Sequence, residues 1–117
     1  MRMKRLFLCY IAGLIAGDGH IEKHRPRIVL ASKARAKLAK IRNTLGIRGS
    51  LFLDKSAGVW KYSLYSEELR DILESEFGIP AGNKSRRLKT PRIRRKDEII
   101  NYVAGWFDAE GWCENYN

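Results

Sequence analysis

The sequence has little cysteine and little proline, and no apolar segment long enough to cross a membrane. Its 117 residues include two cysteines and three prolines. Cys9 and Cys113 make neither a disulfide framework nor a CxxC metal motif, which favours a reducing compartment. The longest apolar run, residues 6–16, is shorter than the roughly 20 residues of a bilayer span, and Gly17–Gly19 is a poor signal-peptide cleavage site. These absences favour an intracellular protein, cytoplasmic or organellar, that does not enter a membrane.

Acidic residues are also scarce. The chain has 13 Asp and Glu against 23 Lys and Arg, for a formal net charge of +10. Residues 84–96 hold eight basic side chains and no acid, whereas residues 67–76 hold five acids and one arginine. A solvated arginine-rich loop is one interpretation of the basic run. Together with the overall charge, however, the asymmetry favours a nucleic acid partner over a membrane surface.

With 44% hydrophobic residues, the chain can bury a core, and its length suits one domain. Hydrophobic periodicity predicts helices over residues 6–16, 33–45, 67–77 and 97–109, and strands over residues 19–23, 27–32, 50–54 and 59–65. Ser66 and Asp97 are expected N-caps, and Gly46 and Gly78 are expected helix stops. The order αββαββα, followed by one more helix, predicts an α+β fold with one antiparallel sheet covered by helices.

The first and last predicted helices end in the same pattern. Residues 10–19 read YIAGLIAGDG, and residues 102–111 read YVAGWFDAEG. A single Gly-Asp-Gly is most simply a turn after a helix. An internal repeat that flanks a whole αββαββα unit is more informative than either copy alone, because both copies then carry the same constraint.

The repeat places small residues four apart, at Gly13 and Gly17 and again at Gly105 and Ala109. Residues four apart share one helix face, so two such helices can approach backbone to backbone. Asp18 near the end of the first copy and Glu110 near the end of the second would then lie close together. Two carboxylates in close proximity favour a divalent cation between them, and oxygen ligands suit Mg²⁺. The expected helix interface comprises Ala12, Gly13, Gly17, Ala104 and Gly105.

Both motif copies and the element order between them resemble the LAGLIDADG homing endonucleases, in the branch with two motifs in one chain. The first copy departs at Ala16, where the family motif has Asp. The resemblance implies a first half over residues 1–96, with a basic loop at 80–96. Residues 97–117 would be the second motif helix and the start of an incomplete second half. A two-motif member has a second ββαββα unit, so we expect a truncated, split or partly represented protein.

The family's activity is site-specific hydrolysis of both strands of a long DNA target, by an enzyme encoded within an intron or intein. The resemblance implies that Asp18 and Glu110 are catalytic and hold Mg²⁺ or another divalent cation such as Mn²⁺. The backbone carbonyls of Gly17 and Ala109 are expected to be additional metal ligands. Lys33, just past the second strand, matches a basic residue near the metals, although it can equally be an ordinary lysine at a helix N-terminus.

The family's strands form a saddle along the DNA major groove, which a two-stranded ribbon fits. Strand alternation and the basic loop give the expected DNA contacts. Arg25 and Arg27 are the best candidates for reading bases, with phosphate contact as the alternative. His20 and His24, four apart in a strand, stand roughly 13 Å apart and cannot share one ion. The full set of expected DNA contacts is His20, Glu22, His24, Arg25, Arg27, Val29, Ser32, Ser50, Phe52, Lys61, Ser63, Arg86, Arg87, Arg92, Arg94 and Arg95.

Three functions remain open from the sequence. The leading one is a DNA endonuclease, the second is an RNA-binding intron-splicing maturase, and the third is a DNA-binding module that does not cut. The presence of both Asp18 and Glu110 argues against the third. The expected partners are double-stranded DNA, with intron RNA as the alternative, and a complementary second half or a second copy of the chain. Trp106 and Trp112 are expected to pack in the core and at the helix end.

Overall fold

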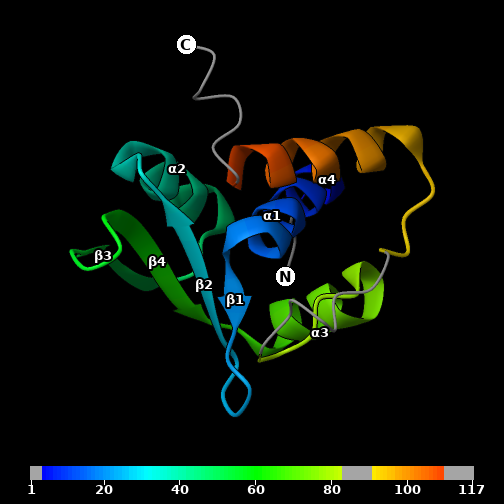
Figure 1. The fold of residues 1–117 in the computed structure, drawn as a ribbon. Coiled ribbons are helices and arrows are strands. Elements are labelled where there is room, and N and C mark those ends of the chain that lie inside the picture. The colour runs from blue at the N-terminus through cyan, green and yellow to red at the C-terminus, as the bar shows by residue number, and fades with distance from the viewer. Residues whose placement is uncertain (1–3, 83–90, 110–117) are drawn as a thin grey trace.

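The computed structural model describes residues 4–82 and 91–109. Within them the chain forms four helices and four strands in the predicted order (Figure 1). The elements are α1 (Arg5–Asp18), β1 (His20–Ile21), β2 (Arg27–Ser32), α2 (Arg35–Leu45), β3 (Gly49–Asp54), β4 (Val59–Tyr65), α3 (Glu67–Phe77) and α4 (Lys96–Ala109). The α+β prediction is confirmed, and so are the exact bounds of β2 and β4.

The strands form one antiparallel sheet in the order β1-β2-β4-β3. The register places Ile28 opposite Ile21 on one side and opposite Leu64 on the other, and all three side chains are buried. The next residue along β2, Val29, pairs with His20 and Ser63 on the opposite face. One face of the sheet is therefore the core face, and we call the other the outer face.

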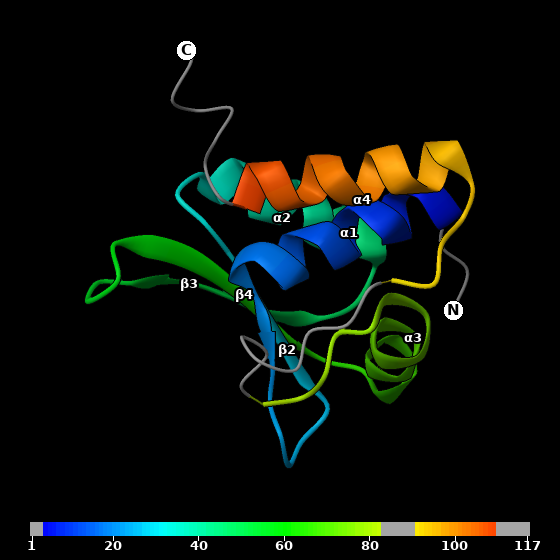
Figure 2. The same cartoon turned by 45° about the vertical axis from the view of Figure 1, so that its right-hand side comes forward.

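The helices lie on the core face of the sheet in two layers. Helix α1 lies between the sheet and α4, and α4 runs alongside it on the far side (Figures 1 and 2). Nearly every residue of α1 from Leu8 to Ala16 is buried, since the helix is covered on both sides. The apolar faces of α2 and α3 complete the same core, in which Phe77 stacks on Tyr102 of α4 at a centroid distance of 6.1 Å.

Local signals in the sequence set the helix ends. The side chain of Ser66 caps α3 by accepting a hydrogen bond from the Leu69 amide at 3.1 Å. Gly46 and Gly78 end α2 and α3 with φ of 70° and 66°, in the left-handed region that favours glycine. The Asp97 carboxylate accepts a hydrogen bond from the Glu98 amide at 2.9 Å, but α4 already begins at Lys96.

Two predicted elements, β1 and α2, are shorter than expected. Strand β1 is only two residues long rather than five, because the chain bends over residues 23–25 to enter the hairpin at Pro26. Helix α2 begins at Arg35 rather than Lys33. Ser32 accepts a hydrogen bond from the Ala34 amide at 3.1 Å, and Ala34 itself is extended. Lys33 therefore lies in a turn before the helix.

The apolar residues of α4 and the end of β3 lie at the surface rather than in the core. The helix buries only Glu98, Tyr102 and Gly105, all of which face the rest of the described chain. The expectation that Trp106 packs in the core is therefore only half right, because it contacts Tyr102 edge-on but is 40% exposed. The exposed apolar side chains of α4 are Ile99, Ile100, Val103, Trp106 and Phe107, and those at the end of β3 are Phe52 and Leu53. Among the described residues, no helix has the length and apolarity to span a bilayer.

Candidate active site and nucleic-acid interface

The two copies of the repeat pack against each other along α1 and α4 with no room for side chains at the contact. A Cβ added to Gly13 would lie 2.0 Å from the carbonyl oxygen of Tyr102. A Cβ added to Gly105 would lie 2.1 Å from the carbonyl oxygen of Tyr10. Tyr10 and Tyr102 occupy the same place in the repeat, and so do Gly13 and Gly105. The contact is thus reciprocal, as across a two-fold axis.

The alanines of the predicted interface do not take part equally. Ala12 is fully buried, whereas its repeat counterpart Ala104 is exposed on α4. The prediction that Ala104 lies between the helices is wrong. Ala12 faces the core beneath the sheet, and the described residues place no equivalent sheet over Ala104. The close contact is instead made by Gly13, Gly17 and Gly105 together with Ala109. A Cβ added to Gly17 would lie 2.6 Å from the Cβ of Ala109.

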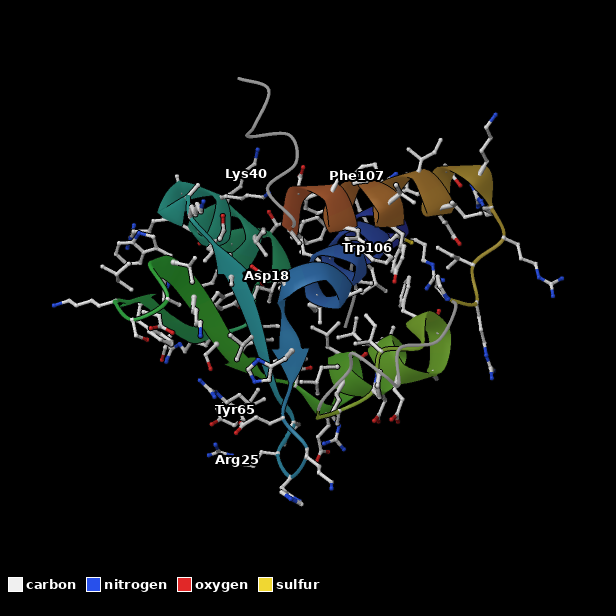
Figure 3. All side chains as sticks on the ribbon, viewed as in Figure 1. Asp18, Arg25, Lys40, Tyr65, Trp106 and Phe107 are labelled. Atoms are coloured by element: carbon white, nitrogen blue, oxygen red, sulfur yellow. The ribbon has the colours of Figure 1, made fainter. Side chains whose placement is uncertain are left out.

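The two helices end together. Because Gly17 meets Ala109, the last turns of α1 and α4 are neighbours, and both helices run in the same direction (Figure 2). Asp18 is the exposed last residue of α1, and Figure 3 shows it beside the end of α4. Glu110 follows Ala109 directly and lies outside the described residues. Two helix C-termini at one place concentrate negative dipole ends, which favour a cation.

Asp108 fixes the end of α4 to two other helices. Its carboxylate accepts a hydrogen bond from the Tyr10 hydroxyl of α1 and pairs with Lys37 of α2 at 3.3 Å. The Lys37 ammonium also lies 5.8 Å from the centre of the Tyr10 ring. Periodicity gave no indication of this contact, because the first copy of the motif has Ala16 in the place of Asp108. These contacts with α1 and α2 restrict rotation of α4 at its C-terminal end, which directly precedes Glu110 in the sequence.

The donor set at the helix ends suits a hard divalent cation. Carboxylate and carbonyl oxygens are the ligands that Mg²⁺ and Mn²⁺ prefer. Within residues 4–82 and 91–109 there is no group of three or more His, Cys, Asp or Glu that could hold a metal ion. Asp18 is thus the one predicted carboxylate ligand among the described residues. Lys33 is exposed in the turn between β2 and α2.

The outer face of the sheet carries most of the predicted DNA contacts. The strand register aligns four side chains in one row across the sheet, in the order His20, Val29, Ser63 and Ser50. A second row runs from Phe52 through Lys61 to Ala31. Val29 is only 4% exposed and Ser63 is 7% exposed, so they offer little surface. His20, Ser50 and Phe52 are exposed. The expectation that Ser32 contacts DNA from this face is wrong, because Ser32 follows Ile28 and Leu30 by twos along β2 and lies half-buried on the core side.

A concave region on this face lies between the β1–β2 hairpin and β3. Arg25 and Arg27 line one side, Phe52 and Ser50 line the other, and Tyr65 completes the rim. Tyr65 is 54% exposed, and Figure 3 shows it next to Arg25. Sequence reasoning missed Tyr65, although it continues the period of two through Lys61 and Ser63.

Charged pairs order the side chains of the outer face. Glu22 pairs with Arg25 at 2.8 Å and with Arg27 at 3.7 Å, and Asp54 pairs with Lys61 at 2.8 Å. The hydrogen bond from Arg25 lowers the pKa of Glu22 below its usual value. The hydrogen bond from Lys61, followed by those from Ser56 and Ala57, lowers the pKa of Asp54 well below its usual range. Both carboxylates are therefore ionised at neutral pH.

The basic loop at 80–96 is described only in part, and we call its described residues 91–96 the basic arm. Arg92, Arg94 and Arg95 are exposed, and Arg95 forms a bidentate pair with Asp97 at 2.9 and 3.2 Å. The backbone amide of Arg92 donates to the carbonyl of Glu76 at 2.7 Å, which ties the arm to the end of α3. His24 is exposed in the β1–β2 hairpin. The predicted contacts Arg86 and Arg87 lie outside the described residues.

A family profile described as a LAGLIDADG-like domain matches residues 8–96. The chain belongs to the LAGLIDADG family. The match begins within α1 and ends where α4 starts, so it spans the first motif, the whole sheet and both intervening helices. No curated protein matches the sequence.

Among solved structures, the LAGLIDADG chain is similar to I-DmoI, which was crystallised with its target DNA, nicked in the coding strand, in the presence of manganese. The two share 17% sequence identity at a TM-score of 0.50. The match covers 90% of this chain and 61% of I-DmoI, so the chain spans less than two thirds of that protein. At this identity the likeness concerns the fold alone.

Proposed function

We propose that this LAGLIDADG chain provides one DNA-reading half and both motif helices of a site-specific endonuclease. The enzyme would hydrolyse both strands of a long double-stranded DNA target with a divalent cation, and would be encoded within an intron or intein. The observation that carries the proposal is the reciprocal contact of Gly13 and Gly105. It brings the ends of α1 and α4 together, and each motif places an acid directly at such an end.

In this proposal Asp18 and Glu110 hold the cation, with the carbonyls of Gly17 and Ala109 as additional ligands. A divalent cation bound there supplies activation of the attacking water and stabilisation of the leaving oxygen. The chain's own residues orient these groups. The close helix contact sets the spacing of the helix ends, and Asp108 restrains α4 through Tyr10 and Lys37. Lys33 is proposed to stabilise the phosphate.

The outer face of the sheet is proposed to lie in the DNA major groove. It is free of covering helices in the described chain, and its arginines, the exposed Arg25 and the half-buried Arg27, suit the acceptor edge of guanine. The basic arm at 91–96, together with Arg86 and Arg87, is proposed to contact phosphates. Counterion release on such contacts makes the logarithm of affinity fall linearly with the logarithm of salt concentration.

A second sheet unit is the proposed partner. The repeat aligns the exposed Ile100, Val103 and Phe107 of α4 with Leu8, Ile11 and Ile15 of α1, which are buried beneath the sheet. Because these apolar side chains occupy equivalent positions on the two helices, we expect those of α4 to be buried by a sheet as well. We therefore propose that a ββαββα unit, from the same polypeptide or from another, packs on α4 and completes the DNA-binding surface.

Cleavage and binding by Asp18→Asn test the proposal. A plasmid carrying the gene that flanks this reading frame is incubated with protein and Mg²⁺, and duplex binding is measured in EDTA. We expect the variant to lose double-strand cleavage and to bind duplex within a few-fold of wild type, because the change removes a ligand charge and leaves the sheet intact. Asp71→Asn, which removes an exposed acid on α3 away from the outer face, is the matched control and should cut.

Three outcomes would contradict the proposal. Cutting by Asp18→Asn at the wild-type rate would mean that Asp18 holds no catalytic metal. Duplex binding by wild type without any cutting would leave a DNA-binding module. Selective binding of the intron RNA in place of the duplex would identify the maturase function instead.

A further inference from the structure

The β1–β2 hairpin carries a cluster of charged side chains whose geometry is already fixed in the protein without DNA. The guanidinium Nη2 of Arg25 donates to Oε1 of Glu22 at 2.8 Å. Nη1 of Arg27 faces Oε2 of the same carboxylate at 3.7 Å. One acid thus lies between two arginines on the outer face of the sheet.

The backbone holds Glu22 in this place. Its amide donates to the carbonyl of Arg27 at 2.9 Å, which continues the β1–β2 ladder by one bond past Ile21. Its Oε2 atom is buried and has no hydrogen-bond partner within the described parts of the chain. A buried carboxylate oxygen without a hydrogen bond is costly unless a nearby charge compensates. The Arg27 guanidinium forms an ion pair with that oxygen, so the carboxylate and this arginine hold each other in place.

Arg27 is held from a second side as well. Its Nε donates to Oγ of Ser63 at 2.7 Å, across the β2–β4 pair. Because Ser63 fixes the Nε end and Glu22 faces Nη1, the guanidinium has one orientation over the sheet. A side chain ordered before binding loses less conformational entropy when it binds. Arg27 is therefore preorganised.

Arg25 and Tyr65 form the open side of the cluster. The Arg25 guanidinium lies 6.0 Å from the centre of the Tyr65 ring, and both side chains are exposed at the rim of the concave region. The ring and the Glu22 carboxylate hold Arg25 from two directions. The cluster therefore presents two arginines and one aromatic ring to a ligand, with a negative charge set between the arginines.

We propose that Glu22 is a positioning residue that makes these arginines read base edges rather than bind phosphates. The paired N–H groups of an arginine match the O6 and N7 acceptors of guanine in the major groove. An anionic phosphate at the same place would meet the Glu22 carboxylate, and like charges repel. Glu22 would thus raise the affinity for a guanine-containing site and lower the affinity for the DNA backbone. This inference rests on the proposed function, since it takes duplex DNA as the ligand.

The test is a selection from a library of randomised duplexes, performed in EDTA so that no strand is cut. The selected duplex and a scrambled duplex of equal length are then titrated with wild type and variants. The specificity ratio is the Kd for the scrambled duplex divided by the Kd for the selected one. Glu22→Gln keeps the size of the side chain and removes its charge. Asp71→Asn makes the same charge change at an exposed position of α3, away from the outer face, and is the matched control.

We expect Glu22→Gln to bind the scrambled duplex more tightly and the selected duplex more weakly. The specificity ratio should fall about 5- to 150-fold, the range that one bidentate base contact contributes. Asp71→Asn should shift both Kd values in the same direction and leave the ratio within about twofold. Arg27→Lys, which keeps the charge but loses the paired donors, should lower the ratio without changing the salt dependence.

A double variant separates positioning from a structural role. If Glu22 acts through Arg27, adding Glu22→Gln to Arg27→Lys should lower the ratio by less than it does in wild type. Equal losses of affinity for both duplexes in Glu22→Gln, with an unchanged ratio, would overturn the inference while leaving DNA binding established. A wild-type protein that binds no duplex would instead overturn the proposed function, and this inference with it.

Discussion

The close contact of α1 with α4 at Gly13 gives the sharpest prediction. Replacing Gly13 with alanine adds a methyl group that would lie 2.0 Å from the Tyr102 carbonyl oxygen, about 1 Å inside the 3.0 Å below which real Cβ contacts are not found. The neighbour is backbone, so no side chain can rotate away, and α1 and α4 must separate. Overpacking of this kind costs about 1–3 kcal/mol and occasionally more. We expect Gly13→Ala to lower the free energy of unfolding by about 3 kcal/mol.

The sign of the change makes this prediction easy to refute. At an unconstrained helix position, glycine to alanine raises stability by about 1 kcal/mol, because alanine has the higher helix propensity. Urea unfolding followed by circular dichroism measures the difference. A more stable Gly13→Ala protein would show that the helices do not touch as described. Ala104→Leu is the matched control, since Ala104 is exposed on α4, and it should change stability by no more than about 0.5 kcal/mol.

The reciprocity of the contact adds a second measurement. Gly105→Ala places a methyl group 2.1 Å from the Tyr10 carbonyl oxygen and should cost about as much as Gly13→Ala. Once one methyl group has separated the helices, the second methyl group fits with less steric overlap. The double variant should therefore lose markedly less than the sum of the two single losses. Strict additivity would contradict a shared contact.

Three further predictions follow from hydrogen bonds and burial. The difference in free energy of unfolding between wild type and Asp54→Asn should be constant from pH 7 to pH 5 and should shrink as pH falls below about 3.9, because the unfolded carboxyl then takes up its proton while the folded one, with its lowered pKa, stays ionised. Urea titrations at several pH values measure this difference, and a difference that persists unchanged into strong acid would contradict the Lys61 pairing. Burial raises the pKa of the Cys9 thiol, so Cys9 should resist iodoacetamide at pH 8 until the protein unfolds, as followed by peptide mass spectrometry. Tyr62→Phe removes the hydroxyl that donates to the Ile47 carbonyl and should cost about 1–3 kcal/mol in urea unfolding, whereas no loss would mean that water replaces the bond.

Short-range signals predicted most of the fold. Ser66 and Gly78 bound α3 because a side-chain cap and a left-handed glycine are properties of a few adjacent residues. The period of two in β4 identified its core face, since Tyr62 and Leu64 are both fully buried. The same pattern misassigned Leu53, which is 43% exposed, because β3 is an edge strand. Alternation gives the face of a residue but not whether anything covers that face.

The candidate site divides in the same way. The repeat alone identified Gly13 and Gly105 as contact residues, because small side chains recur there at helical spacing. The bond between Tyr10 and Asp108, the position of Tyr65 beside Arg25, and the carboxylate of Glu22 between two arginines join residues that no local pattern relates. They depend on how the strands are ordered and how the helices cross.

By itself, the sequence determined the class of fold, the pairing of the two motif helices, and the placement of an acid after each. These properties follow from periodicity and from a repeated arrangement of small residues, which act over one or two helical turns. Only the tertiary structure decided which apolar surfaces are covered. The repeat places apolar residues at matching positions of α1 and α4, but α1 lies beneath a sheet whereas α4 presents Ile100 and Phe107 to solvent. The burial of a helix face depends on the segment that packs against it, and the residues of that face do not by themselves specify such a segment.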